Sequence, residues 1–323
     1  MPANLPPQYI EAEKAFRAAR TAEEKIMALE EMLAVMPKHK GTDHLKAELR
    51  ARIAKLSQST GKKAAGHRAS MLIDKEGAGQ VAVVGLPNAG KSQMVSTLTG
   101  VPLLVADYPF TTRSATPAMM PFENIQVQLI DTPPLTPYSI EFWLPHMLRR
   151  ADALLIVIDL SVSPLAQMDE LTPQLENMRI GIVGIGVRSA DSILTEKKAL
   201  VVGNKLDLPD SRQNYTTLQN KYGSLVLGVS AKNGTGLEEL KARIFQLLDV
   251  IRVYTKAPGQ KPDLTDPMVL PRGSTVEQAA EAVHKDFRAK LKYARLWGSG
   301  KHDGLNVKRD HVLQDGDVIE LHL

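Results

Sequence analysis

A glycine-rich stretch in the first third of the chain has the composition of a phosphate-binding loop. It runs through Gly85, Leu86, Pro87, Asn88, Ala89, Gly90, Lys91 and Ser92 and fits the spacing G-x-x-x-x-G-K-[ST]. Glycines in such a loop let main-chain N–H groups turn towards a polyphosphate, and the following helix adds the positive end of its dipole. Lys91 would reach the β- and γ-phosphates and Ser92 would bind Mg²⁺, with Gln93 also contacting the nucleotide.

Asn204, Lys205, Leu206 and Asp207 form a second motif, directly after the apolar run Ala199–Gly203. A carboxylate at Asp207 can accept two hydrogen bonds from guanine, through N1–H and the exocyclic amine, whereas adenine offers neither in that arrangement. Sites that pair a specific donor with an acceptor discriminate strongly between bases. Lys205 would lay its stem along the base and Asn204 would brace the loop, so the expected nucleotide is GTP or GDP.

A third motif, Ser230, Ala231 and Lys232, follows the predicted strand Leu225–Val229. We expect the main-chain N–H of Ala231 to meet guanine O6 and the two flanking residues to line the same pocket.

Asp131 ends the predicted strand Val127–Ile130, where a phosphate-loop NTPase holds a Mg²⁺-coordinating carboxylate, usually through water. Thr111 and Thr112 lie between the phosphate loop and Asp131, where the first switch is expected. One of these hydroxyls can bind Mg²⁺ and sense the γ-phosphate, and Thr112 is the one we favour. The alternative is that both residues only shape a turn after Pro109.

The elements around the phosphate loop give it a strand–loop–helix context. The apolar run Val81–Val84 predicts a buried strand, and residues 91–99 predict a helix that ends near Gly100. This context separates a phosphate loop from a glycine-rich turn that matches by chance.

Composition limits the class of protein. The 323 residues suffice for two or three domains, 43% of them are hydrophobic, and the net charge is +4. The absence of cysteine excludes disulfides and thiolate metal sites and agrees with a reducing compartment. No apolar run is long enough to span a bilayer, and the first residues lack the pattern of a signal peptide. We therefore expect a cytoplasmic protein without a membrane partner.

Residues 1–78 are the first of three predicted units, a helical hairpin followed by a linker. Apolar residues recur at helical spacing over Phe16–Met36, where Pro37 ends the pattern, and again over Leu45–Leu56. The second helix and the linker are strongly basic. Such a face is usually only solvated, but contact with nucleic acid or the ribosome is an equal alternative.

Residues 79–250 are the second predicted unit, an α/β domain with a mainly parallel sheet, in which apolar β-rich runs alternate with helical patterns. A closing helix has its apolar face over Leu237–Leu248. The segment Asn177–Ser192 reads either as a strand or as a packed loop. The clearest strands are Gln80–Val84, Val127–Ile130, Ala153–Leu160, Ala199–Gly203 and Leu225–Val229.

Residues 251–323 are the third and smallest unit. A capping box at Ser274 and Thr275 predicts a helix to about Phe287, and Asp315–Gly316 reads as a turn. The predicted strands are Ile251–Tyr254, Leu291–Trp297 and Val318–Leu323.

A basic cluster lies within this third unit, with Tyr293 and Trp297 interleaved in it. Aromatic residues in such a pattern are more often core than platforms for base stacking, so RNA contact here is the less favoured alternative. The basic residues are Lys285, Arg288, Lys290, Lys292, Arg295 and Lys301.

The order of the motifs resembles translation-factor-class GTPases, and the phosphate loop, the sequence DYPFTT at Asp107–Thr112 and Asp131 resemble the Obg family. MPKHKGT at Met36–Thr42, IRVYTKAP at Ile251–Pro258 and YARLWG at Tyr293–Gly298 resemble its developmentally regulated GTP-binding (DRG) branch and the prokaryotic relatives of that branch. The resemblance covers nearly the whole chain. It implies that the last unit is a TGS domain, a small ubiquitin-like β-grasp fold associated with RNA and ribosome binding.

Two features depart from the family pattern. Where the family has D-x-P-G at the second switch, this chain has Pro134, which lacks an N–H for the γ-phosphate and has a fixed φ. Eukaryotic DRG proteins also carry an inserted domain within the GTP-binding domain, and the interval from Asp131 to Asn204 has no room for it. The chain is therefore expected to be a compact relative.

Leu135 stands where Ras-like proteins place the glutamine that orients the attacking water. Related GTPases share a hydrophobic residue there and recruit a catalytic group elsewhere. In some relatives an asparagine at the position of Asn88 helps to bind K⁺, so the resemblance implies slow hydrolysis that K⁺ stimulates, with Lys91, Thr112 and Asn88 as the catalytic set. The alternative is that Asn88 only braces the loop.

The predicted function is a Mg²⁺-dependent GTPase that switches conformation on RNA or the ribosome, addressed by its basic hairpin and TGS-like unit. One alternative is a GTP-binding adaptor that hardly hydrolyses, because of Pro134 and Leu135. Another is an ATPase of the Obg-like group, against which Asp207 argues. A TGS module serving a metabolic or synthetase enzyme is a third, but no second catalytic constellation is present. The sequence does not identify a protein partner.

Overall fold

A computed structural model describes residues 7–19, 21–36, 43–59, 73–102, 115–136, 141, 143–185, 194–300 and 302–322. The expectations for Thr111, Thr112 and the DYPFTT segment lie outside these ranges, as does that for the turn after Pro37. Of the linker predicted near residues 57–70, residues 57–59 are helical and the rest lie outside these ranges.

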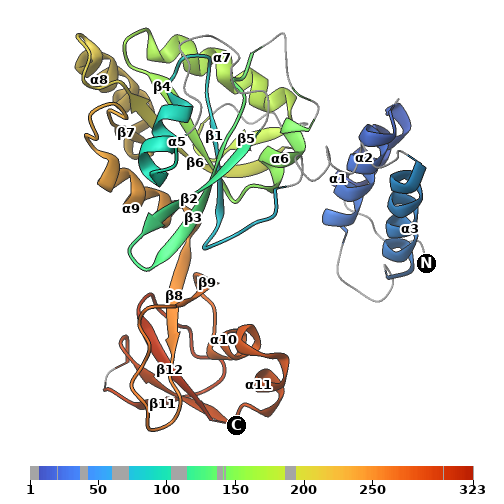
Figure 1. Cartoon of the computed structure of the whole chain (residues 1–323), viewed down its shortest axis with the longest axis vertical. Coiled ribbons are helices and arrows are strands. Elements are labelled where there is room, and N and C mark those ends of the chain that lie inside the picture. Colours follow the sequence, from blue (N-terminus) through green and yellow to red (C-terminus); the bar gives the residue numbers. More distant parts are fainter. Residues whose placement is uncertain are drawn as a thin grey trace.

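A seven-stranded sheet forms the centre of the chain (Figure 1). Its strands are β1 (Gln80–Val84), β2 (Thr116–Phe122), β3 (Ile125–Asp131), β4 (Ala153–Asp159), β5 (Ile180–Ile182), β6 (Thr195–Asn204) and β7 (Val226–Gly228). Their order is β2-β3-β1-β4-β6-β5, with β7 also paired to β6. Every pair is parallel except the β2–β3 hairpin, which confirms the mainly parallel α/β fold.

Helices cover both faces of this sheet. They are α5 (Lys91–Thr99), α6 (Leu144–Arg150), α7 (Pro164–Asn177), α8 (Ser211–Tyr222) and α9 (Leu237–Leu248), with a short 3₁₀ helix η2 (Gly223–Leu225). Alternate residues of β1 point to opposite faces, because side chains alternate along a strand. Val81 and Val83 pack in a cluster with residues of α5 and α9, whereas Ala82 and Val84 pack in a cluster with residues of α6, α7 and α8. The phosphate loop is therefore carried by a strand that is buried on both sides.

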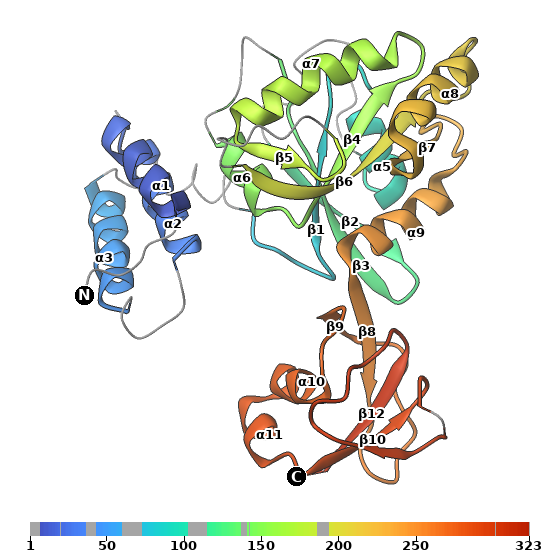
Figure 2. The same cartoon turned by 180° about the vertical axis from the view of Figure 1, so that it is seen from behind.

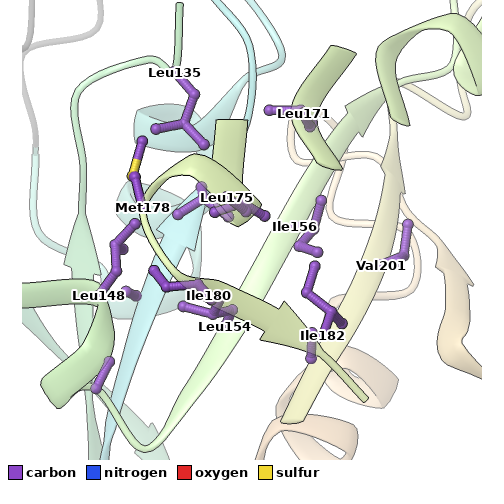
Figure 3. Packing of buried hydrophobic residues seen from close by; sticks show 14 of the residues in the cluster. Leu135, Leu148, Leu154, Ile156, Leu171, Leu175, Met178, Ile180, Ile182 and Val201 are labelled. Carbon is purple, nitrogen blue, oxygen red and sulfur yellow. The ribbon is translucent and has the colours of Figure 1, made fainter. Parts of the chain in front are cut away.

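The cluster on the α6–α7 face contains the residue that follows the second switch (Figure 3). Leu135 is fully buried there and shares the cluster with Leu148, Leu154, Leu171 and Leu175. A side chain held in this core does not project towards a nucleotide.

The segment Asn177–Ser192, which allowed a strand or a packed loop, contains β5, which pairs parallel with the first residues of β6. Residues 186–193 lie outside the described part of the chain.

The N-terminal unit contains α1 (Pro7–Ala18), α2 (Ala22–Ala34) and α3 (Asp43–Ser59). The expectation of one helix over Phe16–Met36 was wrong, because a new helix begins after Thr21. The Thr21 hydroxyl accepts a hydrogen bond from the Glu24 amide, and the Glu24 carboxylate accepts one from the Thr21 amide. This reciprocal capping box satisfies two N–H groups that a helix start leaves unpaired.

The N-terminal unit lies beside α6 in both views (Figures 1 and 2). Arg149 of α6 places its Nε 3.0 Å from Oε1 of Glu31 in α2, and both side chains are largely buried. His146 and Arg149 also line a cavity together with residues of α1 and α2. The unit thus contacts the helix that follows the second switch through this ion pair and the shared cavity.

The C-terminal unit is a five-stranded sheet with two short helices. Its elements are β8 (Val250–Thr255), β9 (Met268–Pro271), α10 (Val276–Val283), α11 (Lys285–Lys290), β10 (Tyr293–Trp297), β11 (Leu305–Val307) and β12 (Asp317–His322). The strand order is β11-β10-β12-β8-β9, and only β8 and β12 run parallel. Thr275 and Gln278 form the capping box expected at the start of α10, but the expectation that this helix runs to about Phe287 was wrong, because His284 is extended and a second helix begins after it. The second sheet agrees with the β-grasp expectation.

The tip of the β2–β3 hairpin meets the start of the C-terminal unit. Asn124 Nδ2 donates to the Tyr254 hydroxyl at 2.6 Å, and the Arg252 guanidinium bonds to Glu123 at the same turn. Phe122 stacks on Phe245 of α9 with ring centroids 5.2 Å apart. This hairpin therefore joins the strand that ends in Asp131 to the C-terminal unit.

Among the described helices, none combines the length and the apolar character needed to cross a membrane.

Candidate functional site

The phosphate loop connects the C-terminal end of β1 to the first turn of α5. Its glycines are required by close packing. A Cβ on Gly85 would lie 2.5 Å from the Val157 carbonyl oxygen, and a Cβ on Gly90 would lie 2.3 Å from Asn204 Nδ2. Gly90 has a φ of 87°, which favours glycine, and it is the residue directly before α5. The N-terminal amides of this helix are therefore held at the open end of a buried strand, where an anion is favoured.

Lys91 lies beneath this loop. Its Nζ donates to the main-chain oxygens of Gly85 at 3.2 Å and Leu86 at 3.0 Å. Burial lowers the pKa of Lys91 to about 8, and Asp131 opposes this shift only in part. A polyphosphate bound on the loop would supply the negative charge that a buried ammonium lacks.

Ser92 and Asp131 are brought together from α5 and β3. The Ser92 hydroxyl donates to Asp131 Oδ2 at 2.6 Å. Asp131 is buried, and burial raises the pKa of its carboxyl group. Its other oxygen, Oδ1, is also buried and has no hydrogen-bond partner among the described residues. A hydroxyl beside a carboxylate with an unsatisfied oxygen is a donor set that fits Mg²⁺ and its water ligands.

The second switch begins close to the phosphate loop. The Thr132 hydroxyl donates to the Val83 carbonyl oxygen at 2.7 Å, and the Leu135 amide donates to the Gly85 carbonyl oxygen at 3.1 Å. Pro134 lies between these two anchored residues. The peptide N–H that follows the proline is therefore already bonded to the phosphate loop, and Thr132, two residues before the proline, is held to β1 through its side chain.

The two predicted base-binding motifs meet at the ends of β6 and β7. Asp207 Oδ1 accepts a hydrogen bond from the Ser230 hydroxyl at 2.6 Å, and this bond is the main cause that lowers the pKa of Asp207. Ser230 is fully buried, whereas Asp207 is exposed. A buried hydroxyl thus holds an ionised carboxylate at the surface, where its second oxygen can face a base.

Asn204 joins the base-binding motifs to the phosphate loop. Its Nδ2 donates to the Ala89 carbonyl oxygen at 2.9 Å, and its Oδ1 accepts from the Ala231 amide at 3.0 Å. The expected bracing role agrees with both bonds. The Ala231 amide, expected to meet guanine O6, here donates to Asn204, so guanine would have to share that donor.

Lys205 pairs with a residue that the sequence motifs did not single out. Its Nζ lies 2.6 Å from Oδ2 of Asp159, at the end of β4, and Lys205 itself has a φ of 66°. Asp159 Oδ1 accepts from the amide and the hydroxyl of Ser161. The signal that could have identified Asp159 was its place at the end of an apolar strand next to the strand that carries Asn204.

The remaining predicted residues lie around the same edge of the sheet. Asn88 is exposed at the tip of the phosphate loop with a φ of 60°. Gln93 is on α5, where its Nε2 bonds to Thr97 Oγ1 at 3.2 Å, and Lys232 is exposed beside Ala231. Thr112 lies outside the described residues. Within those residues, no group of three or more His, Asp or Glu side chains could hold a metal ion by itself.

Two family models match the sequence. Residues 80–205 match a model described as a 50S ribosome-binding GTPase, and residues 251–323 match the TGS domain.

Several curated proteins are similar over almost their whole length. An uncharacterized GTP-binding protein of Methanocaldococcus jannaschii is 29% identical, covering 93% of this chain and 92% of its own. Developmentally-regulated GTP-binding protein 1 of Xenopus laevis and protein 2 of Homo sapiens are 27% and 26% identical, each covering 92% of this chain and 98% of its own. The first alignment extends over 362 residues, more than the 323 of this chain, so that relative contains insertions.

Among solved structures, a GTP binding protein from Pyrococcus horikoshii OT3 is similar with a TM-score of 0.53. It is 19% identical, and the match covers 75% of this chain and 99% of that one. The similarity at this identity concerns the fold alone.

Proposed function

This chain belongs to the developmentally regulated (DRG) type of GTP-binding proteins, and from that premise we propose that it is a Mg²⁺-dependent GTPase that acts as a slow switch on RNA or the ribosome. The observation that supports the choice of nucleotide is the Asp207–Ser230 hydrogen bond, which holds an exposed carboxylate in the loop after β6, a loop joined to the phosphate loop. The two are linked through Asn204.

The proposed reaction is hydrolysis of the bond between the β- and γ-phosphates. Water attacks the γ-phosphorus in line with the leaving oxygen of GDP, and phosphate is released. Catalysis of this kind is mostly positional and electrostatic. Lys91 and the amides at the start of α5 supply fixed positive charge, and Thr112 would act from the first switch.

Ser92 and Asp131 are the residues that would hold Mg²⁺, with Thr112 as the third ligand. When bound there, Mg²⁺ would supply positive charge against the negative charge that develops as the phosphate bond breaks. Their arrangement supports this role because Asp131 Oδ1 is buried without a partner among the described residues.

The proposed rate is low, because Leu135 lies in the hydrophobic core and cannot orient water. We place a monovalent cation, K⁺, beside Asn88, whose exposed amide stands at the loop tip. Turnover should then be faster in K⁺ than in Na⁺, and Asn88→Ala should remove that difference. Equal rates in the two salts, unchanged in Asn88→Ala, would overturn this part of the proposal.

Two measurements distinguish a GTPase from a GTP-binding adaptor that does not hydrolyse GTP and from an ATPase. Single-turnover hydrolysis of labelled GTP in K⁺, with and without ribosomes, should give GDP at a rate that ribosomes raise. No GDP in either condition would favour the adaptor. Excess ATP should fail to compete with labelled GTP, and effective competition would favour an ATPase.

Contact with the ribosome is supported by the description of the family model that matches residues 80–205 and by the TGS match. Co-sedimentation with ribosomal subunits should be stronger in a GTP analogue than in GDP. Binding that is absent in both nucleotides, or equal in both, would contradict a nucleotide-controlled switch on the ribosome.

A further inference from the structure

The face of the C-terminal sheet opposite α10 carries the aromatic residues that were expected to lie in a core, and both are half-buried there. In β10, Ala294 and Leu296 are fully buried in the cluster that also contains residues of α10. Tyr293, Arg295 and Trp297 alternate with them and therefore point to the opposite face. In both views α10 and α11 lie to one side of the strands (Figures 1 and 2). The core interpretation of Tyr293 and Trp297 was wrong, because the helices pack on the other side.

Strand β12 supplies the neighbours of these residues. The sheet register sets Tyr293 opposite His322, Arg295 opposite Glu320 and Trp297 opposite Val318. The Tyr293 and His322 rings are stacked, with centroids 4.5 Å apart and planes 9° from parallel. The Lys256 ammonium lies 4.2 Å from the centroid of the Trp297 ring.

A single buried carboxylate connects the two ring sites. Glu320 accepts from Lys256 Nζ at 2.7 Å through one oxygen and lies 2.7 Å from His322 Nε2 through the other. The bond from Lys256 is the main cause that lowers the pKa of Glu320. The chain of contacts runs from Tyr293 through His322, Glu320 and Lys256 to Trp297, so both rings are fixed in place before any ligand arrives.

The face combines π surfaces with positive charge. Arg295 is exposed between the two rings, and the carboxylate of Glu320 is already ion-paired with Lys256. Tyr293 and Trp297 are four residues apart, roughly 13 Å along the strand at ~3.3 Å per residue. A peptide that bound by adding a strand would need an unpaired strand edge, and β10 and β12 are both interior strands. An unstacked polyanion with flat bases is the ligand that fits.

We infer that this face, which comprises Tyr293, Arg295 and Trp297 with His322 of β12 and Lys256 directly after β8, binds single-stranded RNA by stacking its bases. The inference rests on the proposed RNA contact and specifies where and how it occurs. Aromatic rings on an open sheet are a common platform for unpaired bases, and a guanidinium plane can stack as well. Since few charges take part, the binding depends on salt less steeply than a contact with many phosphates.

Matched substitutions test the role of the rings in the full-length protein. Fluorescein-labelled single-stranded RNA of mixed sequence is titrated with wild type, Tyr293→Leu, Tyr293→Phe, Trp297→Leu and Trp297→Phe. The leucine variants keep an apolar side chain without a π face, and each should weaken binding by about 5- to 150-fold, the equivalent of one lost stacked base. The phenylalanine variants keep a ring and should stay within a few-fold of wild type. Lys285→Ala on α11 is the control for general charge.

A second readout reports stacking directly. Wild-type tryptophan fluorescence should be quenched by the RNA, and the quenching should disappear in Trp297→Phe, since the other tryptophan, Trp143, is buried in the GTP-binding domain. The logarithm of affinity should fall with the logarithm of salt concentration with a slope shallower than about −2, at roughly −0.7 per phosphate contacted. GTP binding and thermal melting establish that each variant is folded.

The outcomes separate this inference from the proposed function. If wild type binds RNA and the leucine and phenylalanine variants bind equally well, the face assignment is overturned while the RNA contact stands. If a blunt RNA duplex binds as tightly as the single strand, stacking of unpaired bases is overturned. If wild type binds no RNA, the RNA contact and this inference fall together, and the GTPase proposal is unaffected.

Discussion

Asn204 and Ala231 are joined by a hydrogen bond of 3.0 Å from the Ala231 amide to Asn204 Oδ1. Nδ2 of the same side chain donates a hydrogen bond of 2.9 Å to the Ala89 carbonyl oxygen and lies against Gly90. One buried amide therefore links the base-binding loop to the phosphate loop, although the two are more than 100 residues apart in sequence. Loss of this side chain should therefore weaken binding of both the phosphates and the base of the nucleotide.

Asn204→Ala should lower the free energy of unfolding by about 1–3 kcal/mol, because it leaves a buried N–H and a buried C=O without partners. Affinities for GTP and GDP should fall in parallel. Asn204→Asp should weaken binding further, since a carboxylate cannot donate to Ala89 and repels its carbonyl oxygen. Urea unfolding and titration with a fluorescent nucleotide measure both effects. Asn233→Ala, which alters an exposed turn in the same loop, is the control, and an equal loss there would contradict the bridging role.

Asp207 is the residue that we propose selects guanine in this site. Asp207→Asn should weaken GTP by about 10- to 150-fold, as expected for lost hydrogen bonds to a charged group. It should also improve binding of xanthosine triphosphate, whose C2 carbonyl needs a donor in place of an acceptor. Ser230→Ala should also weaken GTP binding, but by a smaller factor, because Asp207 loses the 2.6 Å hydrogen bond from the Ser230 hydroxyl that holds its carboxylate. Competition titrations measure both.

The control for this pair is Asp210→Asn, which changes an exposed carboxylate just before α8. It should leave the preference for guanine intact. If Asp207→Asn also left that preference intact, the guanine assignment would be lost.

Lys91 should make nucleotide binding depend on pH. Its pKa of about 8 in the nucleotide-free protein lies below the usual 10.5. Bound phosphates favour the charged form, so binding above pH 8 should take up a proton and affinity for GTP should decline as pH rises. Calorimetry in buffers of different ionisation enthalpy measures this uptake. If no proton is taken up on GTP binding at pH 8.5, Lys91 is already charged before GTP binds.

The same shift predicts a pH-dependent stability without nucleotide. Between pH 8 and 10.5 the unfolded chain keeps the Lys91 proton that the folded chain has lost, so stability should rise with pH in this window. The gain should be about 2 kcal/mol from pH 8 to 9.5. Lys91→Met should lack this component, be more stable than wild type at pH 7, and bind GTP poorly. A Lys91→Met protein that is less stable than wild type at pH 7 would contradict the buried charge.

The sequence predicted the elements whose signals are local. The strand Gln80–Val84, the helix over residues 91–99 and the left-handed Gly100 at its end are found at the predicted positions. Each rests on a short apolar run or on a glycine that the backbone requires. The split between α1 and α2 was missed because apolar spacing continues across it. Its signal, Thr21 followed by Glu24, was nevertheless present.

Relationships between distant strands could not be read from the sequence. The alternation in β10 defines two faces but does not say which one α10 covers, so Tyr293 and Trp297 were placed in the core. The pairing of Lys205 with Asp159 depends on β4 and β6 being neighbours in the sheet. The bridging role of Asn204 towards Ala89 likewise requires the folded arrangement.

His146 should make the packing of the N-terminal unit sensitive to acid. Its ring is buried in α6 at the cavity shared with α1 and α2, and burial, followed by Arg149 and Arg150, lowers its pKa to about 4. Between pH 6.5 and 4 the unfolded chain binds a proton that the folded chain does not, so stability should fall as pH falls. The expected loss is about 2 kcal/mol between pH 6.5 and 5. His146→Gln should reduce this slope, and His44→Gln, which changes an exposed ring on α3, is the matched control. Urea unfolding at intervals of half a pH unit measures how the free energy of unfolding depends on pH. An identical dependence in wild type and His146→Gln would show that this histidine is not the acid-sensitive group.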